Sequence, residues 1–484
     1  MNADDLAFAD VVELQRLLGA KHVSSLELTN LYLDRLERYG PVYNGVVTIL
    51  PERARREARR ADRERARGIV RGPLHGIPYG VKDLLATPDA PTTWGAQPYR
   101  RQRFDFDATA VRKLTDAGAV LLAKLAMVEL AGGFGYDEAD ASFTGPGRTP
   151  WNPQYWSGGS SSGSGIAVAA GLVGFAIGSE TSGSILFPST ACGITGLRPT
   201  YGRVSRHGAM ALCWSLDKLG PLARSARDTH LILAALAGSD PHDPTAVDAP
   251  LSVPRRKLRV AVLRHATKGA MPEVAANFRA TLRELGELCD LAGEVALPKG
   301  PWEELVGTIV NAEGAAAFRD LIESGRSREL RNAQDKLGGY VAYATPAVDY
   351  IDAQRQRTKL NAALVAAMEG YDAVVSPTLD TVTFPIGVPF DKAYPKYGSS
   401  PSLISPGNAA GLPALALPNG FGPHGLPTSF ALLGSAWSEA ALATLGARYQ
   451  RATDFHRKRP PLRTAAASAS ATIPSSTPPT RSVT

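Results

Sequence analysis

The 484-residue chain has few cysteines and no long uninterrupted apolar segment. Its three cysteines, Cys192, Cys213 and Cys289, are scattered and form no CxxC pair. This excludes a disulfide framework or a structural zinc site and predicts a reduced, cytoplasmic protein. Apolar stretches such as IAVAAGLVGFAI contain glycine and are too short to span a membrane, and the acidic start MNADDLAFADVVEL lacks a secretory signal. We therefore expect no membrane association.

Motifs for nucleotides and metals are also missing. Neither a G-x-x-x-x-G-K-[ST] nor a G-x-G-x-x-G pattern occurs near the serine-rich segment at 156–165, which argues against a nucleotide cradle there. The eight histidines are dispersed, with no H-E-x-x-H pair. We therefore expect a protein that uses neither a metal nor another cofactor.

The net charge of +7 has a local origin, because much of the basic excess lies in residues 52–71, ERARREARRADRERARGIVR. Acidic residues alternate there with arginines at spacings of three and four, which is typical of a solvated helix with internal ion pairs. No aromatic platform or RNA-binding signature accompanies the charge. We expect a surface helix and no nucleic-acid partner.

Strand-like and helix-like patterns alternate along the chain. Residues 24–40 have the pattern of an amphipathic helix that begins after a serine cap and ends at Gly40. The expected strands are residues 45–50, 77–85, 119–127, 174–180, 258–263, 372–379 and 413–418. Strands separated by helices predict an α/β fold with a central mixed β-sheet covered by helices.

Further segments complete the expected organisation. Residues 240–256 are rich in proline and aspartate and suggest a surface excursion, and helical patterns in 272–370 suggest the walls of a substrate site. Residues 465–484 are small, polar and proline-bearing, and cannot bury enough apolar surface to offset their ordering entropy. We expect a single domain over 1–464 and a disordered tail over 465–484.

Two short motifs match known nucleophile patterns but lack their context. The letters from Gly159 to Gly163 fit the G-x-S-x-G elbow, which requires a buried strand immediately before it. The preceding residues RTPWNPQYW are turn formers, so the match is weak. Ser215 and Lys218 fit S-x-x-K, but the S-D-N and K-T-G motifs that accompany it in serine β-lactamases are absent.

Two other segments contain groups that are suited to catalysis. GPLHGIPYGVKDLL places Lys82 in an apolar, strand-like run next to Asp83, where burial would lower the pKa of the amine. The alternative is a lysine at the strand end whose charged group reaches solvent and pairs with Asp83 or with a neighbour. GSETSGSILFPS places small residues before Ser184, so its backbone N–H groups can converge on an oxyanion, or the segment can be an ordinary tight turn.

These segments together resemble the amidase signature family of serine hydrolases. The similarity runs through nearly the whole chain, from LELTNLYLDRLERYGPVYNGVV through GPLHGIPYGVKD and GSETSGSILFPSTACGITGLRPTYGRVSRHG to PGNAAGLPALALPNGF. In that family a lysine, a serine in a non-proline cis peptide and a second serine form the catalytic triad. The resemblance implies that Lys82 is the base, Ser160 the cis serine and proton relay, Ser184 the nucleophile, and that the N–H groups of Thr181, Ser182 and Gly183 line the oxyanion hole.

The sequence departs from the family pattern at three positions near the triad. Ser162 and Ser182 stand where glycine is common, and Leu186 stands where arginine is frequent. The triad positions themselves are retained. We expect Ser182 to restrict the backbone conformations of the loop at 181–183, which we call the oxyanion loop.

The expected activity is hydrolysis of the C–N bond of a small amide or carbamate by a monomer or homodimer. Apolar residues at Trp94, Met127 and 131–136 favour a hydrophobic or aryl substrate, as in a urethanase or aryl acylamidase. An alternative is the amidase component of a tRNA-dependent glutamine amidotransferase, but no acidic residue lies between Lys396 and Asn408 to hold the amino group of glutamine. A catalytically idle binding or assembly subunit is the second alternative.

Overall fold

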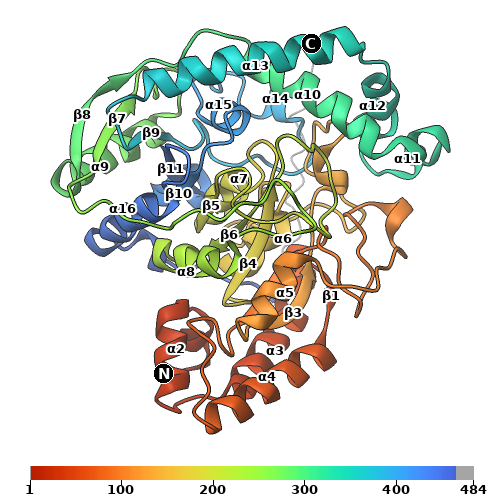
Figure 1. Cartoon of the computed structure of the whole chain (residues 1–484), viewed down its shortest axis with the longest axis vertical. Helices are drawn as coiled ribbons and strands as arrows, with labels where there is room; N and C mark the ends of the chain where they lie inside the picture. The colour runs from red at the N-terminus through yellow and green to blue at the C-terminus, as the bar shows by residue number, and fades with distance from the viewer. Residues whose placement is uncertain (1, 465–484) are drawn as a thin grey trace, which may run out of the picture.

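An 11-stranded mixed β-sheet runs through residues 2–464, the part of the chain that the computed structural model describes (Figure 1). Its strand order is β1-β3-β2-β4-β6-β5-β10-β11-β9-β7-β8. Strands β3, β2 and β4 are parallel neighbours, as are β9, β7 and β8, and the other pairs are antiparallel. The predicted α/β fold, a single domain with a central mixed sheet covered by helices, is confirmed. The predicted tail at 465–484 lies outside the described residues.

The strands are β1 (Val46–Ile49), β2 (Pro78–Lys82), β3 (Val120–Leu125), β4 (Phe175–Glu180), β5 (Thr195–Arg198), β6 (Lys218–Ala223), β7 (Arg259–Leu263), β8 (Asp290–Val295), β9 (Ala373–Pro377), β10 (Ala414–Phe421) and β11 (Pro427–Gly434). All seven strands expected from the sequence are present. The four that were missed, β5, β6, β8 and β11, carry glycine, proline or charged residues that interrupt the apolar pattern. Strands β2, β3, β4 and β6 are buried along their whole length, so helices or loops cover both faces of the sheet there.

The helices are α1 (Ala3–Ala7), α2 (Val11–Gly19), α3 (Ser25–Tyr43), α4 (Pro51–Ala66), α5 (Thr109–Asp116), α6 (Ser162–Ala169), α7 (Leu186–Cys192), α8 (Ala226–Leu236), α9 (Pro272–Leu288), α10 (Trp302–Ala317), α11 (Arg319–Glu323), α12 (Ala333–Tyr343), α13 (Ala347–Ala367), α14 (Phe390–Ala393), α15 (Ile404–Ala409) and α16 (Glu439–Ala452), with short 3₁₀ turns at Gln97–Tyr99, Glu129–Gly132, Arg326–Glu329, Pro423–Gly425 and Phe455–Arg457. Helices α2, α3 and α4 lie at one end of the molecule, and α10 to α13 lie at the other (Figure 1). Among the helices of residues 2–464, none has both the length and the apolar character needed to cross a bilayer.

Helix α3 begins as the sequence predicts but ends later. Ser24 accepts a hydrogen bond from the backbone of Glu27, whose carboxylate accepts one from the backbone of Ser24, and this capping box fixes the first turn. The predicted end at Gly40 is wrong, because the helix continues to Tyr43. Gly40 serves close packing instead, since a Cβ there would lie 2.9 Å from Val46 of β1.

The arginine-rich helix α4 carries the ion pairs that its spacing predicts. Arg53 is nearly buried and pairs with Glu57 at 2.8 Å and with Asp107 at 2.8 Å. Arg60 pairs with Glu64 at 3.3 Å on the exposed side. Part of the charge in this segment is therefore matched within the domain.

The predicted surface excursion at 240–256 is wrong for its first residues. Asp240 and Asp243 are buried, because Ser205 donates to Asp240 at 2.5 Å and the backbone N–H of Arg206 donates to Asp243 at 2.8 Å. Residues 252–256 are exposed, as predicted. The two buried carboxylates anchor this segment to the loop after β5.

A buried ion pair fixes the ends of β2 and β3. Asp83 and Lys124 are fully buried and their charged atoms lie 2.9 Å apart, while Lys124 also donates to Thr92 at 2.7 Å. The alternative that Lys82 pairs with Asp83 is therefore wrong, since the carboxylate is directed to the other strand.

We predict that Lys124→Met lowers the free energy of unfolding by about 3–5 kcal/mol, because it leaves the Asp83 carboxylate buried without a counter-ion. Adding Asp83→Asn should recover much of that loss, since the amide oxygen still accepts from the backbone of Thr93. Urea unfolding of the single and double variants measures both effects. The exposed pair Arg264–Glu294 is the matched control, and its removal should move the midpoint far less. A double variant no more stable than Lys124→Met would contradict the prediction.

Candidate active site

Lys82 occupies the last position of β2, where it is fully buried between the parallel neighbours β3 and β4. Its Nζ donates to Ser160 Oγ at 2.7 Å and to Ser179 Oγ at 2.9 Å. Burial lowers the pKa of Lys82 to about 7, although the nearby carboxylates of Asp217 and Glu180 favour the charged form. Much of the amine is therefore neutral near pH 7, as a proton acceptor must be.

The serine-rich segment is a rigid part of this region. The peptide bond between Gly159 and Ser160 is cis, and Ser160 is buried against Lys82. Ser161 donates through its backbone N–H to the carbonyl of Ser184 at 3.2 Å and through its hydroxyl to the carbonyl of Ser179 at 3.1 Å. The elbow interpretation is therefore excluded for Ser161, because its side chain turns into β4.

Ser184 lies in the loop between β4 and α7 and is nearly buried. The carboxylate of Glu180 holds this loop by accepting from the backbone N–H groups of Ile185 at 2.8 Å and Leu186 at 3.0 Å. Burial opposes ionisation of Glu180, but Arg198, at 2.9 Å, keeps its pKa below the usual range. The loop is therefore fixed by a charged group at the end of β4.

The residues expected to form an oxyanion hole precede Ser184 in the same loop. Thr181 donates its hydroxyl to Asp217 at 2.6 Å, and the Ser182 hydroxyl lies 3.5 Å from that of Ser405. Gly183 has φ +87°, a left-handed conformation that favours glycine. Within residues 2–464, the backbone N–H groups of Thr181, Ser182 and Gly183 donate to no other protein group, so they can receive a ligand oxygen.

A narrow cavity adjoins this loop. It is lined by Leu84, Ala131, Ser179, Thr181, Arg206, Ala209, Met210, Ala211, Leu212, Trp214, Asp217 and Leu219. Most of these side chains are apolar, and Ser179 and Thr181 connect the cavity to the lysine and to the oxyanion loop. An apolar substituent can therefore bind next to the reactive groups.

Asp217 joins the cavity wall to the oxyanion loop. It is fully buried and accepts from the backbone N–H groups of Leu212 and Cys213, each at 2.9 Å, as well as from Thr181. Burial raises the pKa of Asp217, and these three donors oppose the rise. Sequence reasoning missed this residue and Ser179, because neither stands at a spacing that marks a function without the fold.

The S-x-x-K match at Ser215 and Lys218 does not form a site. The Ser215 hydroxyl donates to Glu313 of α10 at 2.7 Å, and Lys218 is the first residue of β6. Arg357 of α13 donates to the carbonyl of Ser215 at 3.0 Å. These helices therefore hold the loop at Ser215 by hydrogen bonds. None of residues 272–370 lines the described cavity, and the expectation that they form the walls of the substrate site stays a prediction.

The apolar positions expected near the substrate are only partly placed there. Ala131 lines the cavity, whereas Met127 is fully buried in the core. Trp94 packs against Tyr99 and Phe318, with ring centroids 4.5 and 6.1 Å apart. The cavity wall is built mainly from the loop at 209–214, which sequence reasoning did not single out.

The structure offers no ready metal site. Across residues 2–464 there is no cluster of three or more histidine, cysteine, aspartate or glutamate side chains that could hold an ion. The three cysteines are buried free thiols.

Comparison with known proteins identifies relatives over nearly the full chain. A family described as Amidase matches residues 27–443. A glutamyl-tRNA(Gln) amidotransferase component from Moorella thermoacetica is 36% identical, over 95% of this chain and 99% of that one. The peptide amidase of Stenotrophomonas maltophilia is 32% identical with a TM-score of 0.80, over 94% of this chain and 99% of that one.

A third relative has the same fold at lower identity. The corresponding glutamyl-tRNA(Gln) amidotransferase component of Thermotoga maritima is 26% identical with a TM-score of 0.74, over 92% of this chain and 94% of that one. The relatives thus include both an amidase and components of amidotransferases, with one fold. The chain belongs to the amidase signature family of hydrolases.

Proposed function

We propose that the protein is a serine hydrolase that cleaves the C–N bond of an amide or carbamate through an acyl-enzyme on Ser184. One observation carries the proposal. The buried amine of Lys82, whose pKa is about 7, lies 2.7 Å from the hydroxyl oxygen of Ser160. A serine hydroxyl becomes an effective nucleophile only when a neighbour accepts its proton. Lys82 and Ser160 supply that acceptor through a relay.

The first half of the reaction makes the acyl-enzyme. Neutral Lys82 takes the proton of Ser160 while Ser160 takes the proton of Ser184, and Ser184 Oγ bonds to the carbonyl carbon. The resulting oxyanion accepts hydrogen bonds from the backbone N–H groups of the loop at 181–183. Donors fixed in this way are each worth about 10²–10³-fold in rate.

The second half releases both products. Lys82 returns the proton through Ser160 to the leaving nitrogen as the C–N bond breaks, which frees the amine. Water then loses a proton along the same relay and attacks the ester carbonyl, and Ser184 recovers its proton as its bond to the acyl group breaks. A carbamate follows the same steps: the amine leaves first, and water converts the alkoxycarbonyl-enzyme to a carbonic acid monoester, which loses CO₂ to give the alcohol.

The lining of the cavity supports a substrate class. It is mostly apolar and reaches Ser179 and Thr181, which favours a hydrophobic or aryl group over a charged one on the scissile amide. Burial of such a group contributes about 25 cal/mol per Å² of apolar surface. We assign a hydrophobic or aryl amide or urethane as the substrate, bound by a monomer or homodimer.

A second candidate function rests on the relatives. The similarity to amidotransferase components favours a role in releasing ammonia from glutamine within a larger complex. Against it, the segment from Lys396 to Asn408 contains no acidic residue. The side chain of Asn408 is engaged by Glu180 at 2.8 Å. The stand-alone hydrolase therefore fits the site better.

We predict that Ser184→Ala abolishes acyl-enzyme formation and lowers kcat/KM by about 10⁴-fold, because no other group can attack the carbonyl. Ser160→Ala should also be severely impaired, since it interrupts the relay. Intact-protein mass spectrometry with a slow anilide or an activated ester detects the adduct. Ser162→Gly, which restores the common family residue outside the relay, is the matched control and should still form it. An adduct on Ser184→Ala would refute the assignment.

We predict that kcat/KM falls as the pH drops below about 7, because protonation of Lys82 removes the proton acceptor. The Lys82 amine is charged at a pH below its pKa and neutral at a pH above it, so activity is retained on the alkaline side. A pH–rate profile between about pH 5 and 9 measures this fall of kcat/KM on the acidic side. Lys82→Arg, whose side chain stays protonated, should be inactive throughout. A flat profile would contradict a lysine base.

We predict that the purified chain alone hydrolyses simple anilides or aryl carbamates faster than aliphatic amides and glutamine. The physical reason is the apolar cavity and the lack of an acidic residue for the glutamine amino group. A screen of product release over these four classes tests this, with Ser184→Ala as the background. Ammonia release from glutamine that requires added subunits would favour the amidotransferase instead. No activity and no adduct at any pH would indicate an idle assembly protein.

A further inference from the structure

Trp214 is a large apolar side chain in an exposed position. Its relative exposure is 55%, yet it lines the same cavity as Ser179 and Thr181. Exposure of an indole to water is unfavourable, and neither the triad nor the oxyanion loop needs this residue. The ring therefore has no role in the chemistry described so far.

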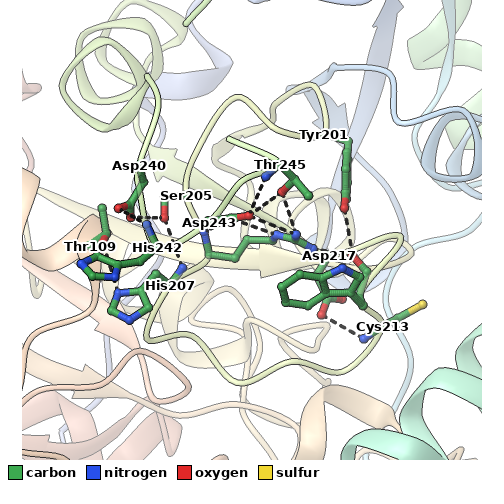
Figure 2. Close-up of polar contacts among 12 residues, drawn as sticks. Thr109, Tyr201, Ser205, His207, Cys213, Asp217, Asp240, His242, Asp243 and Thr245 are labelled. Atoms are coloured by element: carbon green, nitrogen blue, oxygen red, sulfur yellow. Dashed lines mark hydrogen bonds and ion pairs between the residues drawn. The ribbon is translucent and has the colours of Figure 1, made fainter. Parts of the chain in front are cut away.

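The loop holds Trp214 in place from its backbone. The carbonyl of Trp214 accepts from the Tyr201 hydroxyl at 3.1 Å and from the guanidinium of Arg206. On its other side the loop is fixed by Asp217, which accepts from the backbone of Cys213 at 2.9 Å. Figure 2 shows the Tyr201 hydroxyl directed at this loop and Asp217 beside Cys213.

Arg206 also supports the indole ring. Its guanidinium lies over the ring of Trp214, with the central carbon 4.4 Å from the centroid, and over the ring of Tyr201 at 4.9 Å. An arginine stacked on aromatic rings in this way is an attractive cation–π arrangement. Arg206 covers one part of the Trp214 ring, and the residue both lines the cavity and remains 55% exposed.

Arg206 itself is too heavily engaged to be a ligand for the substrate. Its Nη2 donates to Thr245 at 2.8 Å and its Nε to Asp243 at 3.3 Å, and Asp243 also accepts from the backbone of Arg206 at 2.8 Å. Asp243 and Thr245 lie close together, since the Thr245 hydroxyl donates to Asp243 at 2.6 Å (Figure 2). The charge is thus matched within the protein, and Arg206 acts as a support for Trp214.

The charges around the cavity decide whether a cationic, anionic or neutral substituent of the substrate can bind at the Trp214 ring. A cationic substituent would meet Arg206, and the one carboxylate among the described lining residues, Asp217, is occupied by three donors. An anionic substituent would have to compete with Asp243 for Arg206. A neutral planar ring has neither conflict and can stack on the indole.

We propose that Trp214 determines specificity by stacking on a neutral aromatic ring of the substrate. The inference rests on the proposed function and narrows its substrate class to aryl amides or aryl carbamates. The ring can belong to the acyl side or to the amine side of the scissile bond, and matched ligand pairs separate the two.

The test measures binding to Ser184→Ala, which does not turn over the ligand. One pair is acetanilide and N-cyclohexylacetamide, with the ring on the amine side. The other pair is benzamide and cyclohexanecarboxamide, with the ring on the acyl side. We expect at least one aryl ligand to bind more tightly than its cyclohexyl partner, because only the aryl ring is planar.

The decisive variant is Trp214→Leu, made in the Ser184→Ala background. It should reduce the aryl preference by about two- to tenfold, the range of one aromatic pair, and Trp214→Phe should keep part of it. Trp437→Leu is the matched control, because Arg203 lies over the Trp437 ring at 4.7 Å but Trp437 does not line the cavity. Circular dichroism and thermal melting verify that each variant is folded.

The outcomes separate this inference from the proposed function. An unchanged preference in Trp214→Leu, an equal loss in Trp437→Leu, or no detectable binding by either aryl ligand would overturn the role of Trp214. Failure of the wild-type chain to form an adduct on Ser184 would overturn the hydrolase instead. A Trp214-dependent preference together with no adduct would leave an aryl-binding protein without the proposed catalysis.

Discussion

The site depends on one constraint: Lys82 is buried, and no carboxylate of the described residues contacts its amine. Two fully buried lysines lie on adjacent parallel strands, Lys82 at the end of β2 and Lys124 near the end of β3. Asp83 is the sequence neighbour of the first but forms its ion pair with the second, at 2.9 Å. Desolvation lowers the pKa of both lysines, but at Lys124 the contact with Asp83 opposes this effect, whereas the pKa of Lys82 falls to about 7. A swap of this pairing would retain two buried lysines but would protonate the one that contacts Ser160.

The sheet explains how groups distant in sequence meet at that amine. Strands β2 and β4 are parallel neighbours, so their carboxyl ends share one edge of the sheet. Lys82 ends β2, and Ser179 lies one residue before the end of β4, which places both at that edge. Ser161 then binds the serine-rich segment to Ser179 and to the backbone of Ser184. The run of serines thus has two functions, since Ser160 faces the amine while Ser161 fixes the segment to the nucleophile loop.

The sequence was informative where local pattern decides structure. Seven strands with short apolar runs were predicted, and the serine cap of α3 marked its start. It was uninformative where distant contacts decide: β5 and β6 contain Arg198 and Lys218, which look like surface residues yet are buried. The family blocks led to the proposed triad of Lys82, Ser160 and Ser184, because each block is a short pattern within one segment of the chain. The roles of Asp217 and Trp214 depend on contacts between loops, and no local pattern encodes them.

The cavity wall and the oxyanion loop share one support, and this links recognition to reactivity. Asp217 receives the backbone N–H groups of the wall at Leu212 and Cys213 and the hydroxyl of Thr181 in the loop. A group seated against the wall is therefore held at a fixed position relative to the donors that face the developing oxyanion. Binding energy from such a remote group can promote the chemical step when it orients the carbonyl. In the proposed mechanism the triad contacts only the scissile bond and the wall contacts the substituents, so enzymes that share this fold and triad can differ in substrate through the wall alone.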